Sequence, residues 1–598
     1  MMTRFHLLGF GLFLGTIFSS LSMPTQASST HRTLRLSTPV DTTELIVDLQ
    51  EVQVVGYLND RNLLQIPAAL QSIDPVDFGR FDSHSLRNVL NAVSGLRFEE
   101  RAPASYRLSV RGSSLRSPFG IRNIKIYWND FPLTEPTGTT FLNLLDPVQF
   151  SEAEVLKGPS GSIFGAGNGG VILFRSFPRL AQIEGESPSV QPEKKWTQTQ
   201  WKQQIEAGAY GRRIAHSRFL MESKDSQVGL NWANSSLDGY REQSAMNRSI
   251  MELSVRLRDA SAKHQVSTHM MHSQLDYEIP GGLNLSQFQD NPRQARPGNR
   301  FVQGSVESNA EILHDAILGG IHWDWDMNSR WSQKVSIFGQ ASEFENPFNL
   351  DYKIDQRISG GMRGIWTWEN QSSGPNITWS SGFELHQASY AARNYGNLGG
   401  LVDTLNFDDQ IEVDQRLFFS SLEWQLSAKT RIQVSQSFNA LSYKITRLAA
   451  AYGYGPTGSI SRDFSLQWIP RVGLNYEFSP NASTYLSFAR GFSPPTLEEI
   501  RTNEGSVNKG LEAELGTNIE WGFRGYLWDQ QWFVDASFFY FWLKEAIVQQ
   551  QTERGTLVFQ NAGSTVQPGF EVRLEGVLWA SNSGVWRVNY GAAGNYYP

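Results

Sequence analysis

The residues that most often perform chemistry in proteins are not spaced here as in a catalytic or metal-binding motif. The chain of 598 residues has no cysteine, which excludes disulfides, thiolate metal sites and cysteine nucleophiles. Its ten histidines include no His-Glu-x-x-His motif. His264, His269 and His272 are close in sequence, but on a strand His269 faces away from the other two, so no zinc site is expected. Because a Gly-x-Ser-x-Gly elbow is also missing, we predict a protein that is not an enzyme and holds no metal or cofactor.

The glycine-rich stretch from Gly158 to Gly170 resembles a phosphate loop only superficially. It lacks the Gly-Lys-Ser/Thr ending, and a strand from Val171 to Phe174 follows where a helix should begin. We interpret these glycines as turns and points of close backbone approach. Nucleic acid is not an expected partner either, because 52 Lys and Arg against 59 Asp and Glu give a net charge of -7.

The first thirty residues indicate export from the cytoplasm. Arg4 precedes an apolar run from Leu7 to Phe18, and a small-residue stretch ends at Ala27. We therefore expect a Sec-type signal peptide over residues 1–27, cleaved after Ala27. The alternative, a membrane anchor, requires about 20 apolar residues, more than this run supplies. No later segment has about 18 consecutive apolar residues, so a membrane-embedded mature protein would have to be a β-barrel.

From Trp196 onward apolar and polar residues alternate over stretches of about ten positions, the pattern of half-buried strands. Between Met251 and Arg258 every odd position is apolar and every even position is polar, and residues 515–527 repeat the pattern. A soluble β-sandwich or propeller produces the same alternation. The period therefore predicts strands but leaves their environment open.

Three features favour a transmembrane barrel. Tryptophans such as Trp323 and Trp325 cluster near the expected strand ends, where aromatic girdles of membrane barrels lie. Short connections such as 259–262 alternate with long ones, for which we take 275–300 and 390–412. The signal peptide supplies the route to the outer membrane of a Gram-negative cell.

Between Gln50 and Phe177 the pattern changes to the short, mixed segments of a compact α+β unit. Ser85 to Val93 has apolar residues at helical spacing. Three segments are predicted to be strands: Arg107–Arg111, Ile124–Trp128 and Ala153–Leu156. Such a unit fits inside a wide barrel.

Several motifs in this unit follow one another in a specific order: Ala92–Leu96, Val110–Gly112, Ile126–Leu133, Glu154–Pro159 and Gly165–Ile172. Later segments add to them: Gly491–Thr496 with Glu499, Asn518–Gly522 and Gln560–Gly563. Together they resemble the TonB-dependent outer-membrane receptors, both in the plug domain and in the late barrel. The resemblance implies an α+β plug over residues 56–178, a linker over 179–195, and an antiparallel transmembrane β-barrel over 196–598 with the plug in its lumen.

The barrel is expected to be incomplete in this sequence. At about 22 residues per strand with its connection, residues 196–598 supply roughly 18 strands, whereas the barrels of the family have about 22. The chain stops at Asn595–Pro598 and lacks the aromatic last residue that is usual in such barrels. We therefore expect a truncated sequence, with an unpaired last strand near residues 585–595.

Upstream of the plug, residues 49–55 resemble the TonB box. The β-prone residues are Glu51, Val52, Gln53, Val54 and Val55. They follow a Ser/Thr-rich stretch, residues 28–48, expected to be a flexible periplasmic tether. Such a segment can add a strand to a partner's sheet edge, and the resemblance implies TonB with its inner-membrane energy-transducing complex. The alternative is that these residues form the first edge strand of the plug.

The resemblance implies active import of a scarce nutrient, driven by proton-motive force relayed by TonB. Candidate substrate contacts are Arg116, Ser117, Phe119, Thr139 and Phe141 on plug loops, and Arg293, Arg296 and Arg300 on a barrel loop. Arginine grips carboxylates with paired hydrogen bonds, which favours a ferric chelate such as a siderophore. A solvated basic loop is the alternative, with another small nutrient as substrate. A passive porin would have no plug, and a structural envelope protein would need no TonB box.

Four charged residues indicate how the plug is fixed to the barrel wall. Alternation places Glu520 and Glu571 on the lumen face of their strands. Arg111 and Lys157 lie in the two plug motifs where the family has basic residues facing barrel carboxylates. We predict one charge cluster, with nitrogen–oxygen distances within about 4 Å. Separate lumen charges in contact with water are the alternative.

Overall fold

The structure is a computed structural model that describes residues 53–54, 56–58, 61–81, 83–113, 120–178, 198–300, 302–370, 376–501, 505, 507–528, 531–551, 557–580 and 587–598. The predicted signal peptide, tether and linker lie outside these ranges. Six predicted site residues also lie outside them: Glu51, Val52, Val55, Arg116, Ser117 and Phe119. Within the described ranges, no helix is both long and apolar enough to cross a membrane.

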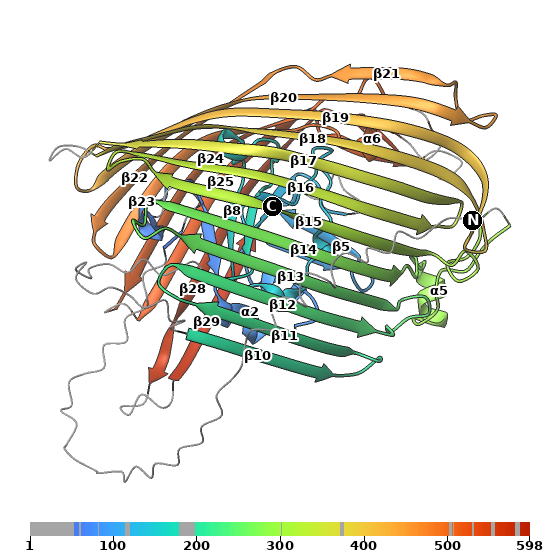
Figure 1. Ribbon diagram of the computed structural model, residues 1–598, viewed down its shortest axis with the longest axis horizontal. Helices are drawn as coiled ribbons and strands as arrows, with labels where there is room; N and C mark the ends of the chain where they lie inside the picture. The colour runs from blue at the N-terminus through green and yellow to red at the C-terminus, as the bar shows by residue number, and fades with distance from the viewer. Residues whose placement is uncertain are drawn as a thin grey trace, which may run out of the picture. The chain divides into compact units, whose positions relative to one another are not determined.

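One antiparallel sheet forms most of the described chain, with its strands side by side in chain order (Figure 1). Within the described residues it has 18 strands, in agreement with the number expected from the sequence. The strands are β10 Gln198–Ala207, β11 Arg213–Glu222, β12 Ser226–Leu237, β13 Met246–Arg258, β14 His264–Glu278, β15 Glu311–Asp326, β16 Trp331–Pro347, β17 Asp351–Glu369, β18 Ile377–Leu398, β19 Leu401–Gln425, β20 Thr430–Ala450, β21 Gly458–Asp463, β22 Gln467–Ser479, β23 Ala482–Ser493, β24 Glu514–Leu527, β25 Trp532–Lys544, β28 Ser564–Ala580 and β29 Arg587–Tyr596. In this part of the chain β10 pairs only with β11, and β29 only with β28.

The strands bury their polar residues and expose their apolar ones. On β13, Glu252 is 0 % exposed and Ser254 is 2 % exposed, whereas the intervening face carries Met251 at 42 %. Trp232 on β12 and Ile337 on β16 are similarly exposed. A soluble sandwich would bury the apolar set, because water disfavours apolar surface. The inverted pattern therefore resolves the choice left open by periodicity in favour of a membrane barrel.

The connections alternate in length as predicted. At one end they are tight, as at residues 223–225, 259–263 and 327–330. At the other end they include residues 279–310 with helix α5 (Leu285–Asp290), 494–513 with α6 (Leu497–Ile500), and 545–563 with the hairpin of β26 (Ile547–Gln551) and β27 (Leu557–Asn561). In outer-membrane barrels the short turns face the periplasm and the long loops face outward.

The predicted long loop over residues 390–412 is wrong. Strand β18 continues to Leu398 and β19 begins at Leu401, so the two strands form a long hairpin that turns at Gly399 and Gly400. Both glycines have positive φ, +62° and +87°, which a tight hairpin turn requires. The prediction failed because each face of this stretch mixes apolar and polar residues. On β18, Tyr390, Ala392 and Asn394 are buried on one face, while Ala391 and Arg393 lie on the other.

Tryptophans mark the short-turn end of the sheet. Trp323 and Trp325 stack with ring centres 5.6 Å apart, and Trp528 and Trp532 meet at 5.4 Å across the turn between β24 and β25. Amphipathic indole rings favour the boundary between lipid and water. The predicted aromatic girdle is therefore confirmed at this end.

The plug is an α+β unit built on a mixed sheet in the order β3-β8-β9-β6-β7. Its elements are β1 Gln53–Val54, β2 Arg61–Asn62, η2 Leu63–Gln65, β3 Leu70–Ile73, α2 Pro75–Arg80, α3 Arg87–Asn91, β4 Leu96–Glu100, β5 Tyr106–Val110, β6 Ile124–Trp128, β7 Phe131–Pro132, η4 Leu142–Leu144, η5 Pro147–Gln149, β8 Glu152–Lys157, α4 Gly161–Phe164 and β9 Gly170–Arg175. The three predicted strands are confirmed to within a residue at each end. The predicted helix over 85–93 is α3, shorter at both ends.

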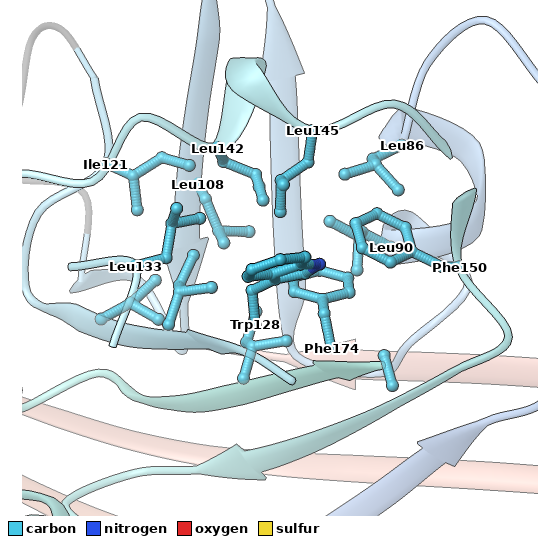
Figure 2. Packing of buried hydrophobic residues seen from close by; sticks show 14 of the residues in the cluster. Leu86, Leu90, Leu108, Ile121, Trp128, Leu133, Leu142, Leu145, Phe150 and Phe174 are labelled. Atoms are coloured by element: carbon cyan, nitrogen blue, oxygen red, sulfur yellow. The ribbon is translucent and has the colours of Figure 1, made fainter. Parts of the chain in front are cut away.

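Trp128 lies at the centre of the plug core (Figure 2). Phe150 and Phe174 stack beside it with ring centres 4.6 Å apart. Leucines from α3 and η4, including Leu90 and Leu142, close the core around them. The same cluster includes Ile250, Met271, Leu318 and Phe338 of the barrel wall, so the plug core continues onto the wall.

Adding one methyl group at Gly170 tests how closely the strands of the plug pack. Gly170 has φ +144°, and a Cβ there would lie 2.2 Å from Leu156 O, the carbonyl of the neighbouring strand β8. We expect Gly170→Ala to lower the free energy of plug unfolding by at least about 1–3 kcal/mol, the range for strained backbone. Urea-dependent proteolysis of the plug measures this. Gly79→Ala is the control, because a Cβ at Gly79 meets nothing within 4 Å; equal stability of the two variants would contradict the prediction.

Candidate functional site at the plug–barrel contact

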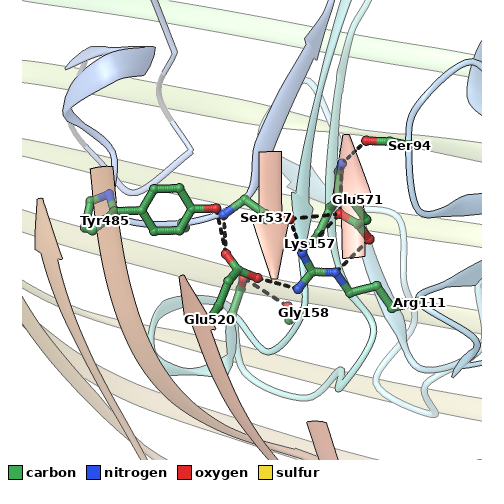
Figure 3. A network of polar contacts seen from close by, with 12 residues as sticks. Ser94, Arg111, Lys157, Gly158, Tyr485, Glu520, Ser537 and Glu571 are labelled. Atoms are coloured by element: carbon green, nitrogen blue, oxygen red, sulfur yellow. Dashed lines mark hydrogen bonds and ion pairs between the residues drawn. The ribbon is translucent and has the colours of Figure 1, made fainter. Parts of the chain in front are cut away.

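Arg111 lies where the plug meets the barrel wall. It follows β5 in a tight turn, with φ +51° at Arg111 and +77° at Gly112, and its N–H donates to Gly95 O at 2.9 Å. The guanidinium extends from this turn between strands β24 and β28. Its Nη1 contacts Glu520 Oε2 at 2.5 Å, and its Nε and Nη2 donate to the two oxygens of Glu571 at 2.9 and 3.1 Å (Figure 3). The turn thus places one plug cation between two wall carboxylates.

Lys157, the last residue of β8, brings a second plug cation to the same place. Its Nζ lies 3.3 Å from Glu571 Oε2 and donates to Ser94 Oγ at 2.8 Å. Burial lowers the pKa of Lys157, and the nearby Glu571 offsets this only in part. Burial also opposes the charge of Arg111, but Glu520 and Glu571 outweigh it and hold the pKa of Arg111 above its ordinary value. The structure therefore brings all four predicted residues into one cluster.

Neutral donors complete the coordination of the two carboxylates. Tyr485 Oη and the N–H of Ala69 donate to Glu520 Oε1 at 2.9 and 2.8 Å. Tyr597 Oη donates to Glu571 Oε1 at 3.1 Å. The side chains of Arg111 and the two glutamates are at most 6 % exposed. Two cations face two anions, and buried charges are tolerated only when paired and hydrogen-bonded in this way.

Wall side chains also hold the first segment of the plug by its backbone. The carbonyls of residues 63–68 accept hydrogen bonds from Arg471, Asn475 and Arg524, with Arg524 Nη1 3.0 Å from two of them. Just upstream, Gln53 and Val54 form β1, which pairs with β2, and Val54 is fully buried. These two residues of the predicted TonB box thus belong to a two-stranded sheet with β2, separate from the five-stranded sheet of the plug.

The described part of the predicted plug loops is enclosed by the wall. Thr139 is 7 % exposed, and its carbonyl accepts a hydrogen bond from the N–H of Glu135 at 2.9 Å. The Phe141 ring meets the His314 ring edge-on at 4.7 Å and lies 4.9 Å from the Arg357 guanidinium. A substrate would therefore reach Thr139 and Phe141 only after this packing changes.

The predicted loop arginines lie at the long-loop end, in the connection between β14 and β15. Arg293 and Arg300 are exposed, and Arg293 stacks on Tyr240 at 5.1 Å. Arg296 is half-buried and donates to Gln303 O at 3.0 Å, and burial lowers its pKa. Arg293 and Arg300 are thus accessible from outside, while Arg296 contributes to the packing of the loop.

Among the described residues, sequence reasoning missed further buried ion pairs between plug and barrel, including Asp146–Arg248 at 2.7 Å, Glu135–Arg357 at 3.2 Å and Lys125–Glu384 at 2.6 Å. The wall members had a detectable signal. Glu384, for example, stands between Phe383 and Leu385 in an alternating stretch, which assigns it to the lumen. Its plug partner is distant in sequence and could not be found in this way.

The histidines take the faces expected of them. His269 is 3 % exposed and faces the plug, whereas the side chain of His272 is 45 % exposed on the outer face. No group of three or more His, Cys, Asp or Glu side chains within the described ranges could hold a metal ion.

A sheet with an apolar outer face and a polar inner face, packed around a plug domain, has the architecture of a plugged membrane β-barrel. The sequence matches the family described as TonB dependent receptor-like, beta-barrel over residues 218–597, and the TonB-dependent Receptor Plug Domain over residues 62–172. The protein therefore belongs to the TonB-dependent receptor family, whose members are outer-membrane β-barrel receptors rather than enzymes.

Solved structures share this fold at low sequence identity. The unliganded ferric citrate transporter FecA has 13 % identity and a TM-score of 0.68, covering 92 % of this chain and 81 % of that chain. The alcaligin outer-membrane receptor FauA from Bordetella pertussis has 12 % identity and a TM-score of 0.63, with coverage of 94 % and 86 %. The siderophore receptor PiuA from Acinetobacter baumannii has 14 % identity and a TM-score of 0.67, with coverage of 92 % and 82 %. At such identity the likeness concerns the fold.

Removing the plug cation that faces two carboxylates should loosen the plug. Arg111→Ala leaves buried Glu520 without a cationic partner and Glu571 with Lys157 alone, and we expect plug stability to fall by about 3–5 kcal/mol, the usual effect of breaking a buried ion pair. The midpoint of plug proteolysis in increasing urea measures the loss. Arg80→Ala is the control, because the Arg80 side chain is 52 % exposed in its pair with Asp77, and an exposed pair is worth at most about 1 kcal/mol. Equal urea midpoints for the two variants would show that the cluster does not anchor the plug.

Proposed function

We propose that this protein is an active-transport receptor that imports a small, scarce nutrient across the outer membrane of a Gram-negative cell, using proton-motive force relayed by TonB. One observation carries the proposal: the lumen holds a plug that is fixed to the wall by buried ion pairs. A passive porin needs an open lumen. A plug held in this way must instead be moved, and moving it requires work.

The energy requirement follows from the number and burial of the contacts. Separating buried ionic partners costs several kcal/mol per pair, and a small solute binding from outside supplies only part of that. Force applied to the N-terminal end of the plug would act on residues 51–55 and then on the backbone that Arg471 and Arg524 hold. Residues 51–55 precede the backbone that the wall holds, so a pull on them would reach those contacts first. This position supports residues 51–55 as the segment that binds TonB.

A ferric chelate is the substrate class that we propose. The exposed Arg293 and Arg300 stand on the long-loop end, where anionic chelates would arrive, and guanidinium groups bind carboxylates in paired geometry. Structures of similar fold include receptors described as a ferric citrate transporter and a siderophore receptor. Other small nutrients are the alternative.

Uptake in cells tests this proposal directly. Cells that express the protein as their only receptor of this class are offered a panel of radioactive ferric chelates, with and without a protonophore. We expect accumulation of at least one chelate, and its loss when the protonophore or a tonB deletion is introduced. Accumulation that continues without proton-motive force would indicate passive flow and contradict the proposal.

Proline at Val54 tests the segment assigned to TonB. The ring removes the backbone donor that an added strand needs, so we expect Val54→Pro to abolish uptake while surface binding of the substrate remains. Because Val54 is buried in the plug, the protease resistance of the plug must be shown to persist. Val54→Ile keeps the donor and the apolar side chain and should transport normally. Normal transport by Val54→Pro would refute the assignment.

A further inference from the structure

A buried carboxylate on β18 joins the wall to two plug positions. Glu384 is 2 % exposed. Its oxygens accept hydrogen bonds from Lys125 Nζ at 2.6 Å and Tyr127 Oη at 2.8 Å, both on plug strand β6, and from Arg363 Nη1 at 2.7 Å on the neighbouring wall strand β17. These four residues are called the Glu384 latch below. The latch is separate from the Arg111 cluster, which uses strands β24 and β28.

Aromatic and aliphatic side chains surround the latch. Arg363 also donates to Ile163 O of helix α4 at 3.1 Å, and its guanidinium lies 5.5 Å from the Phe164 ring and 4.9 Å from the Phe419 ring. Leu417, the partner of Glu384 across the β18–β19 pair, is buried in the same apolar cluster. A polar solute therefore cannot pass between plug and wall here while the latch is formed.

A small polar pocket adjoins the latch on the side of the long loops. Six of its lining residues are Asn123, Lys125, Glu135, Gln415, Ser493 and Thr496. Gln415 is paired with His386, two residues beyond Glu384 toward the long-loop end of β18, which is about 7 Å along a strand. Lys125 belongs both to the pocket lining and to the latch. The pocket and the latch therefore meet at this plug residue.

The charge balance of the latch favours an anion in this pocket. Lys125 and Arg363 supply two positive charges against the single carboxylate of Glu384, whereas the Arg111 cluster is balanced. An anionic group of a solute that reaches the latch from this side can replace Glu384 as the partner of Lys125. That exchange would keep a buried ammonium paired while the plug strand leaves the wall, which avoids the high cost of an unpaired buried charge.

We propose that the substrate crosses between the plug and strands β17 to β20, and that the Glu384 latch is the gate on this route. The inference rests on the proposed transport function. It adds which side of the plug the substrate passes and which contact between plug and wall must open. It also assigns an anionic substrate, for which Lys125 is the first partner inside the barrel.

Two engineered cross-links distinguish this route from others, in a chain that has no native cysteine. Ser162→Cys with Ser435→Cys would join α4 to β20, where the two Oγ atoms are 2.8 Å apart. Asp146→Cys with Ser235→Cys would join the plug to β12 instead, where Ser235 Oγ is 2.8 Å from Asp146 Oδ2. Thiol titration establishes that each bond has formed, and Asp146→Cys alone controls for the lost pair with Arg248.

Wild-type uptake of the ferric chelate is measured first, since its absence would contradict the proposed function rather than this route. Given uptake, we expect the 162–435 bond to reduce it by at least about tenfold, equal to 1.4 kcal/mol in rate, with recovery after reduction. The 146–235 bond should leave uptake close to that of Asp146→Cys alone. Uptake that persists through the 162–435 bond, or equal block by both bonds, would overturn the route.

A second measurement tests the gate itself. Glu384→Gln keeps the shape but removes the charge, and we expect it to admit a large hydrophilic antibiotic without proton-motive force, seen as increased sensitivity of the cells. Glu412→Gln on the outer face of β19 is the matched control, because Glu412 is 55 % exposed in its pair with Lys444. Equal sensitivity of both variants and wild type, at equal surface amounts, would exclude Glu384 as the gate.

Discussion

The pairing of buried charge between plug and wall is the interaction on which the rest of the structure depends. A barrel with lipid outside must place its polar residues inside, and this wall therefore presents carboxylates and guanidinium groups to its lumen. Once water is excluded, each of these groups needs a partner. The plug supplies them from its turns and strand ends, as Arg111 does for Glu520 and Glu571. The charged side chains of the plug therefore complement those on the inner face of the wall.

This arrangement is stable yet can be opened. An apolar contact of the same area would also hold a plug, but it would not exchange partners with an incoming solute. Ion pairs can do so, because a charged solute replaces one partner while the other stays paired. The Arg111 cluster is balanced and strengthened by tyrosine and backbone donors, as suits a permanent anchor. The Glu384 latch carries an excess cation beside a pocket, as suits a contact that opens.

The backbone contacts of residues 63–68 have a different character. Arg471 and Arg524 bind carbonyl oxygens of the plug rather than its side chains, so these contacts do not depend on which side chains the segment carries. Such contacts are made and broken one carbonyl at a time. They lie directly after the segment assigned to TonB, where a pull on the chain would first be felt.

Local patterns of apolar and polar residues were enough to predict the strand period, the lumen face of the strands, the expected number of strands and the main plug elements. The sequence also indicated the Arg111 cluster, since alternation orients Glu520 and Glu571 and the resemblance pairs them with plug cations. The three-dimensional structure was needed to show that residues 390–412 form two strands, because each face of this hairpin mixes apolar and polar residues. It alone joined Lys125 to Glu384 and Asp146 to Arg248, partners more than 100 residues apart whose meeting depends on how the plug is rotated within the wall.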